Sequence, residues 1–219
     1  MIFVNYKTYE ESSGDNALSL TKIIEEVSKE SQIKIIPVVQ ALDLKEIVSE
    51  SNLEIWAQKV DPVDFGAHTG SILPKEVREA GAYGTFLNHS ENKISDFNVL
   101  TNTVKVCKEV GLKTLVFAAD LEELKRNLDI SPDFISYEPP ELVGSTDTSV
   151  SQAKPEVIKD AVALAKDAGI PLIIGAGVKS EEDMRIGLQL GAAGFAIASS
   201  IVKAEDPKKE LLQLVEGYK

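Results

Sequence analysis

The sequence has very little cysteine and histidine: Cys107 is the only cysteine among 219 residues, and the histidines are His68 and His89. One cysteine cannot form a disulfide within the chain or supply the thiolates of a structural zinc site. The two histidines are far apart, and carboxylates do not cluster beside them. We therefore expect a protein of the reducing cytoplasm with no dedicated transition-metal site.

Positive charge and long apolar runs are also scarce. The 35 acidic residues outnumber 23 basic ones, giving a formal net charge of −12. This balance makes nucleic acid and an anionic membrane poor partners. No apolar stretch approaches the roughly 18 residues that a membrane-spanning helix needs. The chain begins in a strand-like run, Ile2–Val4, rather than in a basic and then apolar leader. We expect a soluble protein that is not exported.

Eight short strand-like runs recur along the chain, most of them separated by helical patterns. Several are apolar at consecutive positions and rich in β-branched residues, which is typical of parallel strands buried on both faces. The runs are Ile2–Val4, Ile33–Val39, Glu54–Ala57, Gly84–Asn88, Lys113–Phe117, Phe134–Tyr137, Leu172–Gly175 and Phe195–Ala198.

The segments between these runs have apolar residues at helical spacing, as in Ala17–Lys29, Glu156–Ala168 and Glu181–Leu190. Asp15 is placed to cap the first helix. Glycines stand where helices should end, and Pro171 opens a strand; these glycines are Gly111, Gly169 and Gly191.

Eight alternating units without a linker favour an α/β fold, a single (β/α)8 TIM barrel spanning residues 1–219. A doubly wound open sheet stays possible, because periodicity counts units and does not prove closure. In a barrel, the chemistry lies at the carboxyl ends of the strands.

Three of those strand ends carry chemically capable side chains. Asn5 and Lys7 follow the first strand and point the same way because strand residues alternate faces. His89 follows the fourth strand, before residues that favour a helix start. A helix amino terminus aimed at an imidazole disfavours its protonation, so this histidine could stay neutral and donate a hydrogen bond. Glu138 ends the sixth strand, where a buried carboxylate is costly unless it is used or paired.

Each of these residues also has a purely structural interpretation. Lys7 could be a solvated lysine at a strand edge, His89 a packed histidine with a satisfied partner, and Glu138 an ion-pair partner of Lys7 across the barrel mouth. Glu91 could be an ordinary carboxylate in the first turn of a helix.

The last two strands end in small residues that let backbone N–H groups converge on an anion, as in the phosphate sites of barrels. These residues are Gly175, Ala176, Gly177, Ala198 and Ser199. A lysine, a histidine, a glutamate and an oxyanion cradle on different strands suit proton transfer next to a carbonyl on a small phosphorylated substrate.

These residues, in this order, resemble the triosephosphate isomerase family along the whole chain. The family motifs appear as Asn5-Tyr6-Lys7, Ala57-Gln58, Gly66-Ala67-His68-Thr69-Gly70, His89-Ser90-Glu91 and Glu138-Pro139. The form Glu138-Pro139-Pro140-Glu141-Leu142-Val143-Gly144, with the later Ala153–Val157, is similar to the short archaeal branch.

Three departures from the family pattern stand near the expected phosphate site. The Gly-Thr-Gly after the hinge is here Gly144-Ser145-Thr146, and Gly177 replaces a serine after the seventh strand. The paired glycines of the last loop become Ala198 and Ser199. Backbone N–H groups can still bind phosphate if these side chains point away.

The resemblance implies interconversion of dihydroxyacetone phosphate and glyceraldehyde 3-phosphate through an enediol(ate), in glycolysis and gluconeogenesis, without a cofactor or metal. It implies Glu138 as the base, His89 as the electrophile, Lys7 as an electrostatic stabiliser and Asn5 as a positioning and substrate-binding residue. Backbone N–H groups of Gly144, Gly177, Ala198 and Ser199 are the implied phosphate donors.

The resemblance also implies a moving lid and an oligomer. Residues 139–147 would close over the ligand and exclude water. The long loop Asp61–Leu73 would place Thr69 beside Asn5 and Lys7 of a second copy, giving a homodimer or a homotetramer.

Two other hypotheses remain open from the residues. The first is a different barrel enzyme that acts on a sugar phosphate. A Schiff-base aldolase needs a lysine on a late strand, and the ends of strands five to eight do not offer one. An Amadori-type isomerase needs acidic residues on strands one and five, and only Asp120 is near either position. A non-catalytic binding barrel is the other, and the presence of Lys7, His89 and Glu138 together argues against it.

Overall fold

The strands of the computed structural model, which describes residues 1–138 and 155–219, are short and buried because apolar residues fill both of their faces. They are β1 (Ile2–Asn5), β2 (Ile35–Val39), β3 (Trp56–Ala57), β4 (Gly84–Leu87), β5 (Lys113–Ala118), β6 (Phe134–Tyr137), β7 (Leu172–Ile174) and β8 (Gly194–Ile197). All neighbouring pairs are parallel and follow chain order.

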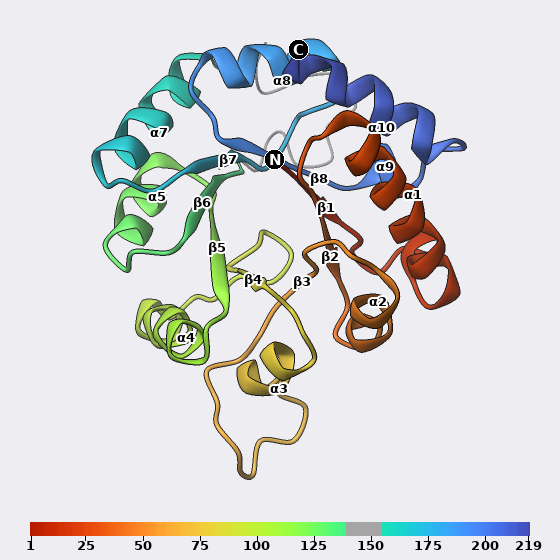
Figure 1. The fold of residues 1–219 in the computed structure, drawn as a ribbon. Helices are drawn as coiled ribbons and strands as arrows, with labels where there is room; N and C mark the ends of the chain where they lie inside the picture. Colours follow the sequence, from red (N-terminus) through yellow and green to blue (C-terminus); the bar gives the residue numbers. More distant parts are fainter. Residues whose placement is uncertain (139–154) are drawn as a thin grey trace.

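Strand β1 pairs with both β2 and β8, so the sheet closes into a barrel (Figure 1). The TIM barrel prediction is therefore confirmed, and an open doubly wound sheet is excluded. Half of the strand ends coincide with the predicted runs, and the other half differ by one or two residues, as is usual for boundaries drawn from pattern alone.

The alternation of side chains along each strand separates two apolar layers. Phe3 points into the barrel, where its ring lies 4.9 Å from that of Trp56, centroid to centroid. Ile2 and Val4 point outward and pack under the helices. The barrel interior is thus a packed core, and only its mouth is available for chemistry.

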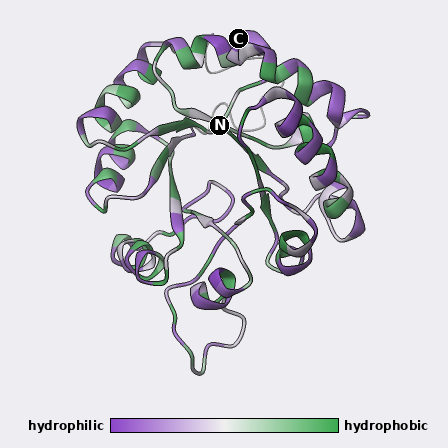
Figure 2. Ribbon diagram, viewed as in Figure 1, coloured by the Kyte–Doolittle hydropathy of each residue, from purple (hydrophilic) through white to green (hydrophobic). Residues whose placement is uncertain are grey.

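Helices surround the barrel and place their apolar residues against the strands, as the hydropathy colours of Figure 2 show. They are α1 (Asp15–Ser31), α2 (Leu44–Glu50), α3 (Pro74–Glu79), α4 (Phe97–Val110), α5 (Leu121–Leu128), α7 (Pro155–Asp167), α8 (Glu181–Gln189), α9 (Ser199–Val202) and α10 (Pro207–Val215), with short 3-10 turns η1 (Glu10–Ser12) and η3 (Glu216–Tyr218). No helix within residues 1–138 and 155–219 is long and apolar enough to cross a membrane.

The predicted helix ends are mostly right. Gly111 caps α4 in a left-handed conformation with φ 78°, and Gly169 and Gly191 also have positive φ just beyond helix ends. The prediction for Asp15 is wrong: Gly14 is the capping residue, and Asp15 is the first residue of α1 without a side-chain cap. Its carboxylate still lies in the first turn, where it complements the helix dipole.

The connection between β3 and α3 leaves the barrel as a long excursion, visible below α3 in Figure 1. Its neck is closed by Asp61, whose N–H donates to the Ile72 carbonyl (2.9 Å) and whose carboxylate accepts from the Ile72 N–H (2.7 Å). Beyond this neck residues 64–71 are exposed, and the Phe65 side chain projects with 61% of the residue's surface accessible.

Candidate active site

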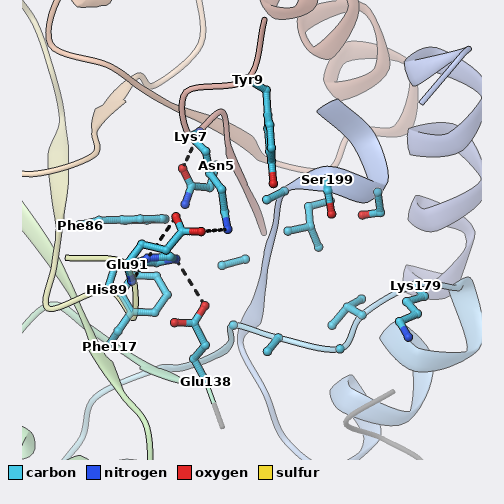
Figure 3. A pocket seen from close by; sticks show the side chains of 18 residues that line it. Asn5, Lys7, Tyr9, Phe86, His89, Glu91, Phe117, Glu138, Lys179 and Ser199 are labelled. Carbon is cyan, nitrogen blue, oxygen red and sulfur yellow. Dashed lines mark hydrogen bonds and ion pairs between the residues drawn. The ribbon is translucent and has the colours of Figure 1, made fainter. Parts of the chain in front are cut away.

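The carboxyl ends of the strands surround a cavity of about 620 Å³. Figure 3 shows one wall formed by side chains from the ends of β1, β4 and β6, and a facing wall formed by the segments after β7 and β8. Of the predicted site residues, those lining the cavity are Asn5, Lys7, His89, Glu91, Glu138, Gly175, Ala176, Gly177, Ala198 and Ser199.

Glu138 follows β6 with only 5% of its surface exposed. Its Oε1 lies 3.4 Å from His89 Nε2, and its Oε2 accepts a hydrogen bond from the Ser90 backbone N–H at 3.3 Å. The carboxylate therefore lies against the loop that follows β4. It does not pair with Lys7, the structural alternative raised by the sequence.

The imidazole of His89 is oriented by its own loop. The Glu91 backbone N–H donates to Nδ1 at 3.1 Å, so Nδ1 acts as an acceptor and carries no proton. A neutral imidazole then carries its proton on Nε2, the nitrogen that faces Glu138.

The predicted helix start at His89 is wrong. Residues after His89 form a turn in which the Asn92 N–H donates to the His89 carbonyl at 2.8 Å. Helix α4 begins only at Phe97, where Asp96 caps it by accepting from the Asn98 N–H. The group that contacts the imidazole is thus a single backbone N–H of the turn, that of Glu91, and not a helix amino terminus.

Lys7 lies just beyond β1 in a left-handed backbone conformation with φ 48°, which residues other than glycine rarely adopt. Its backbone N–H donates to Asn5 Oδ1 (3.0 Å), and its carbonyl accepts from Gln58 Nε2 (2.7 Å). Its ammonium pairs with Glu91 Oε1 at 2.7 Å. Asn5 and Gln58 thus hold a strained backbone that points the lysine into the cavity.

The segments after β7 and β8 present small residues and backbone N–H groups, together with the polar side chains of Lys179, Ser199 and Ser200. Among the described residues, no acceptor receives the N–H of Ala176, Gly177 or Ser199. Gly177 has φ 70°, a conformation that suits glycine.

Gly175 has a different role from the predicted one. Its N–H already donates to the Tyr137 carbonyl at 2.9 Å, so it is not available to a phosphate. A Cβ at this position would lie 2.5 Å from Ser136 Oγ and 3.2 Å from Glu138 Cβ, so only glycine leaves room for these two residues. Gly175 therefore lines the cavity as predicted, but with its N–H already bonded it acts as a spacer beside Glu138.

Two predictions fall outside the cavity or outside the described residues. Gly144 and the whole lid segment 139–147 lie outside the described residues. Thr69 is exposed on the excursion after β3 and does not line the cavity of its own chain.

The sequence did not point to several cavity residues. Tyr9 lines the cavity, with the Lys203 ammonium 5.6 Å above its ring, and the rings of Phe86 and Phe117 form the floor beside His89. Two of these residues could have been inferred from the sequence, because Tyr9 follows Lys7 by two residues and Phe117 lies near the end of β5. Within the described residues, no three His, Cys, Asp or Glu side chains gather as a metal site would need.

Comparisons with known proteins identify similar sequences and folds. The sequence model of a family described as triosephosphate isomerase matches residues 1–218. A triosephosphate isomerase from Methanobrevibacter smithii is 41% identical over 219 residues, with 98% of this chain and 97% of that protein covered. One from Saccharolobus solfataricus is 44% identical over 210 residues, covering 95% and 92%.

A solved structure agrees in fold. The triosephosphate isomerase of Bartonella henselae has a TM-score of 0.79 over 99% of this chain and 98% of its own, at 19% sequence identity.

Proposed function

The chain belongs to the triosephosphate isomerase family, and we propose on that premise that Glu138, His89, Lys7 and Asn5 carry out its reaction. It is an isomerase that interconverts dihydroxyacetone phosphate and D-glyceraldehyde 3-phosphate. The reaction moves one proton between two neighbouring carbons and one proton between the oxygens on those carbons, through an enediol(ate).

Glu138 is the proposed base that carries the proton between the two carbons. A carboxylate that is 5% exposed and borders the cavity can take a carbon-bound proton without competing strongly with water. Its two contacts with the loop after β4 hold the carboxylate at the edge of the cavity.

His89 is the proposed electrophile. With Nδ1 occupied by the Glu91 N–H, Nε2 is the donor, and it lies on the cavity side within 3.4 Å of the base. A donor at this place can polarise the substrate carbonyl and follow the negative charge between the two oxygens of the intermediate.

Lys7 and Asn5 are the proposed charge stabiliser and its support. Lys7 has 18% of its side chain exposed, so its charge acts in a partly desolvated cavity where Coulomb attraction to an enediolate is strong. Asn5 holds the Lys7 backbone through its Oδ1 and leaves its carboxamide nitrogen for the substrate.

The phosphate group is proposed to bind on the facing wall, to backbone N–H groups of Ala176, Gly177, Ala198 and Ser199, with Gly144 contributing from beyond the described residues. In Figure 3 the Glu138–His89 pair and the segments after β7 and β8 lie on different sides of the cavity, which supports a substrate with chemistry at one end and phosphate at the other.

The contact between Glu138 and His89 Nε2 is the observation that carries this assignment. A coupled assay of glyceraldehyde 3-phosphate isomerisation tests it, with Glu138→Gln as the variant. We expect wild-type turnover and a loss of about 10²- to 10⁴-fold in the variant, the usual worth of a positioned base. Activity of Glu138→Gln within a few-fold of wild type would remove Glu138 from the mechanism.

We further propose a homodimer, or a homotetramer built from dimers, through the exposed excursion after β3. Exposure of residues 64–71 and of the large Phe65 ring supports a contact surface there, and Thr69 would meet Asn5 and Lys7 of the second copy. Shortening residues 63–72 to a tight turn should give a folded monomer with strongly reduced turnover. Sedimentation equilibrium of the wild type decides it, since an active wild-type monomer at micromolar concentration contradicts the proposal.

We also infer one domain over residues 1–219, located in the cytoplasm. Tyr218 binds the Met1 carbonyl (2.7 Å), so the two ends of the chain meet on the same barrel. The single cysteine is fully buried, and burial, helped by Asp133, raises the pKa of the Cys107 thiol to about 12, which leaves it unreactive.

A further inference from the structure

One turn, residues 88–94, supplies most of the contacts on the cavity wall that carries Lys7, His89 and Glu138, which we call the proton-transfer wall. His89 Nε2 and the Ser90 N–H contact Glu138, while Glu91 binds Lys7 with its side chain and His89 with its N–H. Whatever fixes this turn therefore sets the relative positions of the base, the electrophile and the lysine.

Asn88 stands at the start of this turn and is 2% exposed. Its φ of 60° lies in the left-handed region, where asparagine is better tolerated than most residues. This backbone conformation turns the chain out of β4 and sends His89 toward the cavity.

The carboxamide of Asn88 is held on three sides. Its Nδ2 donates to the Phe117 carbonyl (2.9 Å) and to Glu123 Oε1 (2.7 Å), and its Oδ1 accepts from the Ile94 N–H (2.9 Å). The first two bonds anchor the turn to β5 and α5. The third closes the turn upon itself, from residue 88 to residue 94.

Glu123 is itself fixed by groups on both sides. It accepts from the Ala119 N–H (2.7 Å) and receives the Lys93 ammonium on both carboxylate oxygens (2.8 Å each). Lys93 belongs to the same turn, so the ion pair is a second tie between the turn and α5.

Phe117 connects this anchor to the imidazole. Its carbonyl accepts from Asn88, and its ring packs edge-on against that of His89, 4.9 Å between centroids at 74°. One residue of β5 thus fixes both the start of the turn and the plane of the imidazole.

We propose that Asn88 is a positioning residue that holds the turn 88–94 in the geometry that aims His89 Nε2 at the substrate and the Ser90 N–H at Glu138, with Glu123 and Lys93 as its supports. This rests on the proposed function, because the residues that it positions are those proposed to react. Asn88 itself does not line the cavity.

The variant Asn88→Gly tests this directly, because glycine accepts φ 60° and only the carboxamide contacts are lost. We expect kcat to fall about tenfold or more while KM changes less than about threefold, since a misplacement of about 1 Å can cost about 10²-fold in rate. Nitrogen-15 NMR of the imidazole should show the proton of His89 shared between Nδ1 and Nε2 rather than held on Nε2.

Asn127→Ala is a matched control. Asn127 is also fully buried and donates to the same Phe117 carbonyl at 3.2 Å, but it belongs to α5 and does not contact the turn. It should lose stability with kcat within about twofold of wild type and an unchanged His89 spectrum.

Three results would overturn the proposal: wild-type kcat in Asn88→Gly, a rise in KM without a fall in kcat, or an equal loss of kcat in the Asn127→Ala control. If Asn88→Gly does not fold, Glu123→Gln decides, and a normal kcat together with a normal His89 spectrum contradicts the proposal. If Glu138→Gln is inactive but Asn88→Gly is fully active, this inference alone is rejected. If the wild-type protein has no isomerase activity, the proposed function is rejected, and the NMR test of Asn88 remains valid.

Discussion

The two walls of the cavity are built in different ways. On the proton-transfer wall, three side chains each take part in a hydrogen bond: Lys7 Nζ donates to Glu91 Oε1, His89 Nδ1 accepts from the Glu91 N–H, and Glu138 Oε2 accepts from the Ser90 N–H. On the facing wall, where we propose that phosphate binds, the segments after β7 and β8 offer small side chains and backbone N–H groups, together with Lys179. This difference fits the proposed division of work, since proton transfer needs closely placed side chains, whereas anion binding needs only that backbone N–H groups can approach the anion.

The sharpest way to test this difference is to remove the donor on the proton-transfer wall. His89→Gln keeps a polar side chain but loses the imidazole aimed at the carbonyl. We expect kcat to fall by about 10²- to 10³-fold, the usual effect of losing one such donor. Binding of 2-phosphoglycolate, measured by calorimetry, should change by less than about threefold if phosphate is held by the other wall. A parallel loss of affinity and turnover would show that the walls do not divide the work.

Gly175 lies where the two walls meet, and its substitution should affect the catalytic one. Gly175→Ala brings a methyl group to 2.5 Å from Ser136 Oγ and 3.2 Å from Glu138 Cβ, so the base must shift. We expect a loss of about 1–3 kcal/mol in unfolding free energy, typical of overpacking, together with a fall in kcat.

Gly169→Ala controls for the substitution itself. Gly169 has φ 70° with open space around its Cβ position, so alanine there adds backbone strain of about 1–2 kcal/mol away from the site. Chemical denaturation and steady-state kinetics on both variants separate the effects. Equal kcat values in the two alanine variants would contradict the spacer role of Gly175.

The smallest expected effect concerns the electrostatic support beneath the proton-transfer wall. Burial alone would raise the pKa of Glu123, but hydrogen bonds from Lys93, the Ala119 N–H and Asn88 outweigh it and lower the pKa below 4.5. A depressed pKa means that Glu123 stabilises the fold above pH 4.5 and that this contribution is lost as pH falls through the folded-state pKa. Glu123→Gln should therefore be destabilising at neutral pH and progressively less so below pH 4.5.

The exposed neighbour Glu122 gives the control for this pH dependence. Glu122→Gln should change the unfolding free energy by less than about 0.5 kcal/mol at either pH, as is usual for surface substitutions. Urea unfolding of both variants and the wild type, at neutral pH and below pH 4.5, measures how the destabilisation changes with pH. A destabilisation by Glu123→Gln that stays constant into acid would contradict the electrostatic support.

The sequence predicted the barrel, and it predicted which side chains gather at one cavity, because both depend on side-chain identity. Buried parallel strands need runs such as Leu172–Ile174, and a lysine, histidine or glutamate at a strand end is visible in the sequence itself. Asn5, Lys7, His89 and Glu138 accordingly line one cavity.

Backbone hydrogen bonding was less predictable. Gly175 belongs to the same small-residue pattern as Gly177, but the register of β6 and β7 gives its N–H to Tyr137. The sequence after His89 contains residues typical of a helix start, yet the Asn88 carboxamide binds the Ile94 N–H and closes a turn, so that α4 begins only at Phe97. Such choices depend on tertiary partners that local pattern does not contain.

The central claim is that the turn after β4 presents His89 as a neutral donor from Nε2. Nitrogen-15 NMR of the free enzyme at neutral pH tests it most directly, with the His89 signals assigned by their loss in His89→Gln. The Glu91 N–H at 3.1 Å from Nδ1 predicts an imidazole with its proton on Nε2 and an unprotonated, hydrogen-bonded Nδ1. An imidazolium, or a proton on Nδ1, would contradict the account.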